Sequence, residues 1–116
     1  MTTNVGLIGL GAMGSGMAGS LRRHGCAMHV LDVRAEVAQA FAAQGGVACA
    51  SPAELGALCT VVVSVVVNAA QTEAVLFGEN GCAATMRAGS VFVMCSTVDP
   101  NWSIALEARL AALGIL

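Results

Sequence analysis

Residues 9–14 constrain the fold of this 116-residue chain more than any other segment. They read Gly-Leu-Gly-Ala-Met-Gly, follow the apolar run 5–8, and begin a stretch with helical apolar spacing at Met13, Met17 and Leu21. A glycine turn between a strand and a helix brings the backbone close to a phosphate, and the helix start offers it free N–H groups. The segment therefore predicts a strand–turn–helix unit that holds the pyrophosphate of a dinucleotide.

The three glycines of this turn have different expected roles. Gly9 permits the tight turn, Gly11 leaves room for the pyrophosphate at the backbone, and Gly14 lets the helix pack closely. The predicted pyrophosphate site consists of Gly9, Leu10, Gly11, Ala12, Met13 and Gly14.

An acidic residue is expected beside the adenosine ribose. Asp32 ends the second predicted strand and follows Gly9 by 23 residues. A carboxylate there accepts hydrogen bonds from the ribose hydroxyls and repels a 2′-phosphate, so NAD is expected and NADP is less favoured. Arg34 leaves two alternatives, pairing with a 2′-phosphate or lying solvated at a helix start, and Asp32 could also cap that helix. Val33 lies between them and belongs to the predicted site.

Two further strand ends are expected at the cofactor, because ligands of doubly wound sheets lie over the carboxyl ends of the strands. Val66 and Val67 end the fourth predicted strand and are expected to border a ribose. Asn68 is included in the site, although it also suits the cap of the next helix. Thr97 follows the fifth strand, where its hydroxyl either contacts the nicotinamide side or satisfies a nearby turn.

Strand-like and helix-like runs alternate along the whole chain, which predicts an α/β fold with a doubly wound parallel sheet, a Rossmann domain over residues 1–116. The hydrophobic content of 57% suits strands that are covered on both faces. A sixth strand is expected to begin at residues 115–116. The predicted strands span residues 5–8, 28–31, 47–49, 61–67 and 90–95, and the predicted helices 13–24, 35–44, from 52 after the cap Ser51, 69–76 and 100–113.

Charge and composition argue against several other classes of protein. The net charge of −2, with no basic cluster, excludes a nucleic-acid partner. The apolar stretch 57–70 is too short for a membrane span, so no membrane association is expected. The five cysteines are spread widely without ligand spacing, which predicts no metal site and buried free thiols in a reducing, cytoplasmic compartment.

The glycine turn, followed by Met17-Ala18 and Leu21, resembles the opening of the β-hydroxyacid dehydrogenases, which include 3-hydroxyisobutyrate and 6-phosphogluconate dehydrogenases. Residues 73–81 and 95–100 resemble two further family segments. Within the family, residues 67–71 running into 75–78 look most like the L-threonate dehydrogenase branch. The resemblance implies NAD(P)-dependent oxidation of a small 3-hydroxy acid and supports Thr97 as a nicotinamide contact. Asp32, in place of the Asn-Arg-Thr of NADP-preferring members, again favours NAD.

The resemblance also implies that part of the family's machinery lies outside these residues. The family places its acid/base lysine in a following helical domain, which is absent here, and all five basic side chains of this chain are arginine. Arginine does not release its proton at working pH, so no catalytic residue is predicted. We expect a fragment of a dehydrogenase that binds NAD without turnover and associates as a homo-oligomer through apolar surface. A stand-alone, non-catalytic NAD-binding module is the alternative, and Gly14 argues against a methyltransferase.

Overall fold

Five parallel strands form one sheet in the order β3-β2-β1-β4-β5 in the computed structural model, which describes residues 3–66, 68–95 and 100–116. The strands are β1 (Asn4–Ile8), β2 (Ala27–Leu31), β3 (Val47–Ala48), β4 (Val61–Ser64) and β5 (Val91–Met94). The helices are α1 (Ala12–Arg23), α2 (Ala35–Ala42), α3 (Pro52–Leu58), α4 (Ala69–Phe77) and α5 (Pro100–Ala111), with a 3₁₀ turn, η1 (Cys82–Ala84). The predicted α/β class and parallel sheet are confirmed.

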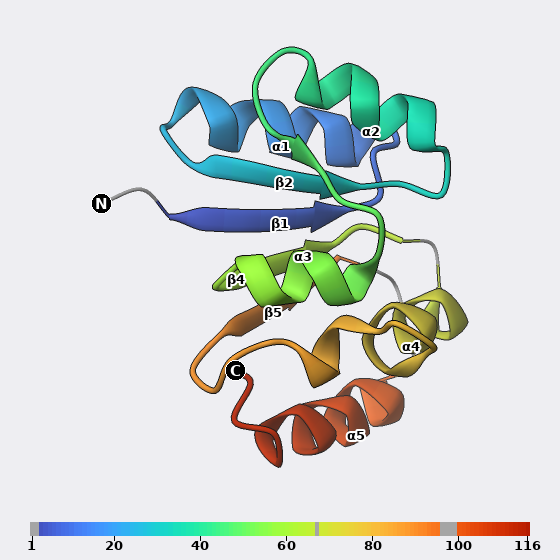
Figure 1. The fold of residues 1–116 in the computed structure, drawn as a ribbon. Helices are drawn as coiled ribbons and strands as arrows, with labels where there is room; N and C mark the ends of the chain where they lie inside the picture. The colour runs from blue at the N-terminus through green and yellow to red at the C-terminus, as the bar shows by residue number, and fades with distance from the viewer. Residues whose placement is uncertain (1–2, 67, 96–99) are drawn as a thin grey trace.

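Helices lie on both sides of the sheet (Figure 1), and alternate residues of the central strands face two separate cores. Leu7 and Val63 pack with residues of α1 and α2 on one face of the sheet. Their neighbours Ile8 and Val62 pack on the other face with residues of α3, α4 and α5. Helices therefore cover both faces, which explains why the strands are apolar along their whole length.

The largest difference between the predicted and observed elements is the length of the fourth strand. β4 ends at Ser64, whereas the sequence predicts a strand to residue 67. Its neighbour β1 ends at Ile8 because the chain turns at Gly9, and the last bond to β4 runs from the Val65 N–H to the Ile8 carbonyl oxygen at 2.8 Å. Val66 lies past the end of β1, so its apolar character does not extend the strand, and Val67 lies outside the described residues.

The register brings the carboxyl ends of the central strands to one edge of the sheet. Ile8 is opposite Leu31 of β2 and Ser64 of β4, and Ser64 is opposite Met94 of β5. At the outer side of β5, the Leu116 N–H donates to the Ser90 carbonyl oxygen at 2.8 Å, and the Leu116 carbonyl accepts from Phe92 at 2.9 Å. Residues 115–116, where the sequence predicts the start of a sixth strand, make these two backbone bonds, but no strand is assigned to them in the described sheet.

The cysteines differ in burial, and three of them have raised pKa values. Burial raises the pKa of Cys49 and Cys82 to about 11 and that of Cys59 to about 12. Cys26 and Cys95 are also free but only partly buried, and they pack against the outside of the core on the α1–α2 face. The expectation of burial therefore holds for three thiols of the five. Within the described ranges, no helix is long and apolar enough to cross a membrane.

Candidate functional site

The turn after β1 has a geometry that requires glycine at its first position. Gly9 has a φ of +101°, and a Cβ atom there would lie 2.1 Å from the carbonyl oxygen of Val65. Its N–H donates to the Leu31 carbonyl oxygen at 2.9 Å, which extends the β1–β2 ladder into the turn. Both the backbone angle and the close neighbour exclude a side chain, as the sequence predicted.

The start of α1 is open toward solvent. Gly11 is the N-cap residue of α1 and makes no side-chain cap bond. A Cβ atom added at Gly11 would have no heavy atom within 4 Å. The first turn of the helix holds no acidic residue. N–H groups at a helix start have no intrahelical acceptor and attract anions. This end of α1 therefore has both the space and the donors for a phosphate group.

Gly14 allows the close packing of the helix that the sequence predicts. The nearest neighbour of Gly14 is the backbone of the glycine turn. A Cβ atom at Gly14 would lie 1.8 Å from the carbonyl oxygen of Gly9 and 3.5 Å from the side chain of Leu7. Helix α1 can lie against the turn and β1 only because this side chain is missing.

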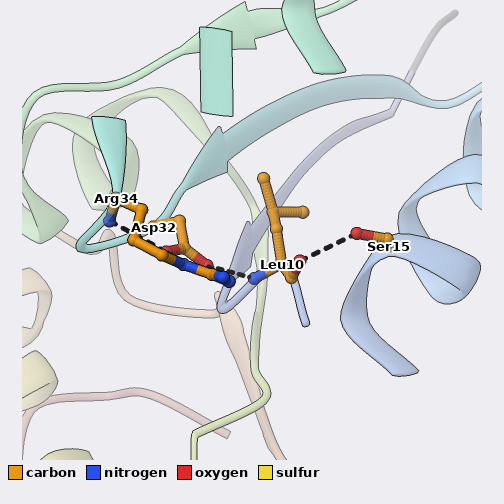
Figure 2. A network of polar contacts seen from close by, with 4 residues as sticks. All are labelled: Leu10, Ser15, Asp32 and Arg34. Carbon is orange, nitrogen blue, oxygen red and sulfur yellow. Dashed lines mark hydrogen bonds and ion pairs between the residues drawn. The ribbon is translucent and has the colours of Figure 1, made fainter. Parts of the chain in front are cut away.

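The carboxylate of Asp32 joins the end of β2 to the glycine turn (Figure 2). Its Oδ2 atom accepts from the Leu10 N–H at 2.7 Å, and its Oδ1 atom accepts from the Arg34 N–H at 2.9 Å. The Arg34 guanidinium also pairs with it, with Nε 3.0 Å from Oδ1 and Nη2 3.4 Å from Oδ2. Only 6% of the Asp32 side chain is exposed, against 55% for Arg34.

These contacts keep Asp32 ionised. Partial burial acts to raise the pKa of this carboxyl, but hydrogen bonds from Arg34 and from the Leu10 N–H outweigh it, so the pKa lies below its ordinary value. The helix-start interpretations of this pair hold only in part. The N-cap of α2 is Arg34 rather than Asp32, and the Arg34 guanidinium is ion-paired as well as half exposed.

A cavity of about 920 Å³ lies over the carboxyl ends of the strands, within the size range of cofactor sites. It brings together predicted residues from three separate segments. They are Gly9, Gly11, Asp32, Val33, Arg34 and Val66. Val33 is fully exposed at this site.

Sequence reasoning missed the opposite wall of the cavity, which follows β3 and includes Cys49, Ala50 and Pro52. The Ala50 N–H donates to the Glu54 carboxylate at 2.8 Å, and the Glu54 N–H donates to the Ser51 hydroxyl at 3.2 Å. The sequence predicts a helix start at Ser51. The hydrogen bonds of this helix start hold the wall in place. Gln71, Ala74 and Val75 of α4 also line the cavity.

The remaining predicted residues lie beside the cavity or outside the described residues. Leu10 is buried and meets the site through its N–H, while Ala12 and Met13 are exposed at the helix start. Asn68 caps α4, because its side-chain oxygen accepts from the Gln71 N–H at 2.9 Å. Val67 and Thr97 lie outside the described residues, so their roles stay predictions.

The fold and this site define a doubly wound α/β domain of the dinucleotide-binding class. The sequence matches, over residues 4–116, the family described as the NAD binding domain of 6-phosphogluconate dehydrogenase. The chain therefore belongs to this family of NAD(P)-binding domains, among the β-hydroxyacid dehydrogenases, which confirms the resemblance.

Individual relatives give the same result. The chain is 57% identical over 116 residues to L-threonate dehydrogenase of Cupriavidus necator, covering 100% of this chain and 39% of that protein. It is 32% identical over 112 residues to mitochondrial 3-hydroxyisobutyrate dehydrogenase of Mus musculus, covering 97% and 33%. A crystal structure of 3-hydroxyisobutyrate dehydrogenase from Salmonella typhimurium matches with a TM-score of 0.92 and 35% identity, covering 97% and 39%. The chain thus spans well under half the length of these proteins.

Proposed function

We propose that the protein binds NAD(H) in this cavity and forms the cofactor-binding part of an NAD-dependent 3-hydroxyacid dehydrogenase. The observation that carries the proposal is the cavity itself, in which the open start of α1 and the ionised Asp32 border the same space. The pyrophosphate would lie at Gly11, and the adenosine ribose near Asp32. Bound NAD supplies the hydride acceptor for the alcohol carbon of the substrate.

Preference for NAD over NADP is supported by the charge at the ribose end. A 2′-phosphate would approach a nearly buried carboxylate, which repels it. Arg34 would have to leave its ion pair with Asp32 to compensate the phosphate, and this rearrangement opposes NADP binding.

The substrate of the whole enzyme is proposed by similarity to be a small hydroxy or sugar acid such as L-threonate or 3-hydroxyisobutyrate. The support is the 57% identity to a protein named L-threonate dehydrogenase. Because the sequence contains no lysine, we expect these residues to bind cofactor without turnover. A cytoplasmic location is proposed from the free thiols, and a homo-oligomer from exposed apolar side chains such as Ile104 and Leu116.

Isothermal titration of the chain with NADH and NADPH tests the proposal. NADH is expected to bind at least tenfold more tightly than NADPH. Gly11→Val is expected to abolish binding of both, because its side chain enters the space assigned to the pyrophosphate. The structure leaves that space open, so the variant should fold normally.

Gly16→Val is the matched control. Gly16 lies in the same helix and also has open space around it, but it does not line the cavity. Its affinity for NADH should equal that of the wild type. If Gly11→Val bound NADH as tightly as Gly16→Val, the pyrophosphate would not lie at this turn and the proposed site would be wrong.

A further inference from the structure

Two consecutive peptide units in the glycine turn, which meet at the Leu10 Cα atom, are each held by a side chain (Figure 2). The Leu10 N–H donates to Asp32 Oδ2 at 2.7 Å, and the Leu10 carbonyl oxygen accepts from the Ser15 hydroxyl at 2.9 Å. Asp32 is 22 residues away at the end of β2, whereas Ser15 lies in the first turns of α1. The turn is thus tied to the sheet on one side and to the helix on the other.

The hydrogen bond from Leu10 to Asp32 follows the last backbone bond between the β1 turn and β2. The Gly9 N–H makes the last backbone bond between the β1 turn and β2, to the Leu31 carbonyl oxygen. The next N–H, that of Leu10, has the Asp32 side chain as its acceptor in place of a backbone carbonyl. The carboxylate therefore provides one further hydrogen bond between the turn and the end of β2, at the residue directly before Gly11.

The two bonds have a consequence for the residues that follow. Because the peptide units on both sides of the Leu10 Cα atom are held, rotation about φ and ψ of Leu10 is restricted. This fixes the direction of the chain into Gly11 and the start of α1. Hydrogen-bond donors that already point at the ligand site need no ordering when the ligand binds. The entropic cost of binding is then smaller and the affinity is higher.

We propose that Ser15 and Asp32 form a clamp on the Leu10 backbone that pre-forms the pyrophosphate site. Ser15 is then a positioning residue for the cofactor. Asp32 has a second role, independent of its recognition of the ribose. This inference rests on the proposed function for its ligand, but the clamp itself is a property of the ligand-free protein.

A ligand without ribose hydroxyls separates the two roles of Asp32. 2′,3′-Dideoxy-ADP keeps the pyrophosphate but offers no hydroxyl to the carboxylate. Asp32→Ala is expected to weaken its binding about tenfold, the loss of one charge-assisted hydrogen bond. Asp32→Asn keeps an acceptor for the Leu10 N–H and should recover most of this affinity. Glu107→Ala, an exposed acid on α5 outside the network, is the charge-matched control and should bind like the wild type.

Ser15→Ala tests the other side of the clamp. It is expected to weaken NADH, NADPH and dideoxy-ADP alike, about fivefold each, since one neutral hydrogen bond is lost. Alanine is the better helix former, so the urea midpoint should stay the same or rise. A merely structural role would lower stability and affinity together. Ser20→Ala, in the same helix but outside the network, should change affinity less than twofold.

Hydrogen exchange of the Leu10 amide provides a measurement without any ligand. The amide should be protected in the wild type and exchange much faster in Asp32→Ala, while the Val30 amide within β2 is unchanged. The clamp is refuted if the wild-type Leu10 amide exchanges freely, or if Asp32→Ala and Ser15→Ala bind dideoxy-ADP like the wild type. If the wild type bound none of the three ligands, the proposed function would fail, and the exchange result alone would decide the clamp.

Discussion

Gly14→Ala is the substitution whose effect the structure determines most directly, and Gly16→Ala is its natural control. Both positions lie in α1, two residues apart, and both changes add a single methyl group. At Gly16 the new Cβ atom meets nothing within 4 Å. At Gly14 it would lie 1.8 Å from the Gly9 carbonyl oxygen and 2.9 Å from the carbonyl carbon.

The expected energies follow from these distances. Alanine in place of glycine inside a helix gains about 1 kcal/mol at either position. At Gly14, reaching the 3.0 Å minimum of real contacts moves helix and turn apart by 1.2 Å. The obstacle is backbone, so the cost lies near the upper end of overpacking, about 3 kcal/mol. The net change is a loss of about 2 kcal/mol for Gly14→Ala and a gain of about 1 kcal/mol for Gly16→Ala.

Urea unfolding followed by fluorescence of the single, half-buried Trp102 measures both variants, with circular dichroism as a second probe. The two free energies of unfolding should differ by about 3 kcal/mol with similar m values. Gly14→Ala should also bind NADH more weakly, because α1 has moved from the turn. If the two variants agreed within about 0.5 kcal/mol, the close contact between helix and turn would not exist in solution.

Three further predictions concern charged groups. Arg34→Gln should weaken the binding of NADPH about tenfold and leave the binding of NADH unchanged or tighter, as measured by calorimetry. The variant loses the guanidinium that could meet a 2′-phosphate, and its Asp32 is freed from the ion pair. Equal losses of affinity for both cofactors would contradict this role of Arg34. The lowered pKa of Asp32 means that its stabilisation is complete above the ordinary value of 3.8 and is lost as pH falls through the folded value. The stability difference between wild type and Asp32→Asn should therefore be constant from pH 7 to 5 and vanish in strong acid, and a difference that persisted there would refute it. Arg109→Met should cost about 1 kcal/mol in urea unfolding, less at high salt, because its bidentate pair with Glu73 is half exposed and its guanidinium lies 3.9 Å from the Phe77 ring centroid.

The parts of the site that sequence reasoning predicts are those that depend on local backbone geometry. Gly9 and Gly14 are identified by their spacing between a strand and a helix, and the structure gives each the expected constraint. The cap at Ser51 and the alternation of strands and helices are local in the same sense. For these features most of the physical cause is local, although the backbone that excludes a side chain at Gly9 is that of the distant Val65.

The parts that could not be predicted depend on register and on packing between distant segments. The bond from Leu10 to Asp32 exists because Ile8 pairs with Leu31 in the sheet, and no local pattern specifies that pairing. The wall at Ala50 approaches Asp32 only after β3 has docked against β2. The early end of β4 has the same origin, because its length is limited by β1 rather than by its own residues.

The pairing of Ile8 with Leu31 also determines where the chain can change length. Each residue advances a strand by about 3.3 Å and alternates the face on which its side chain lies. Deleting one residue within β2 would carry the Asp32 carboxylate to the opposite face, out of reach of Leu10. A residue added in the connection 24–26, before β2 begins, would leave that geometry intact. Insertions are therefore tolerated in the loops at the amino edge of this sheet, while the strands that lead to the cavity must keep their number of residues.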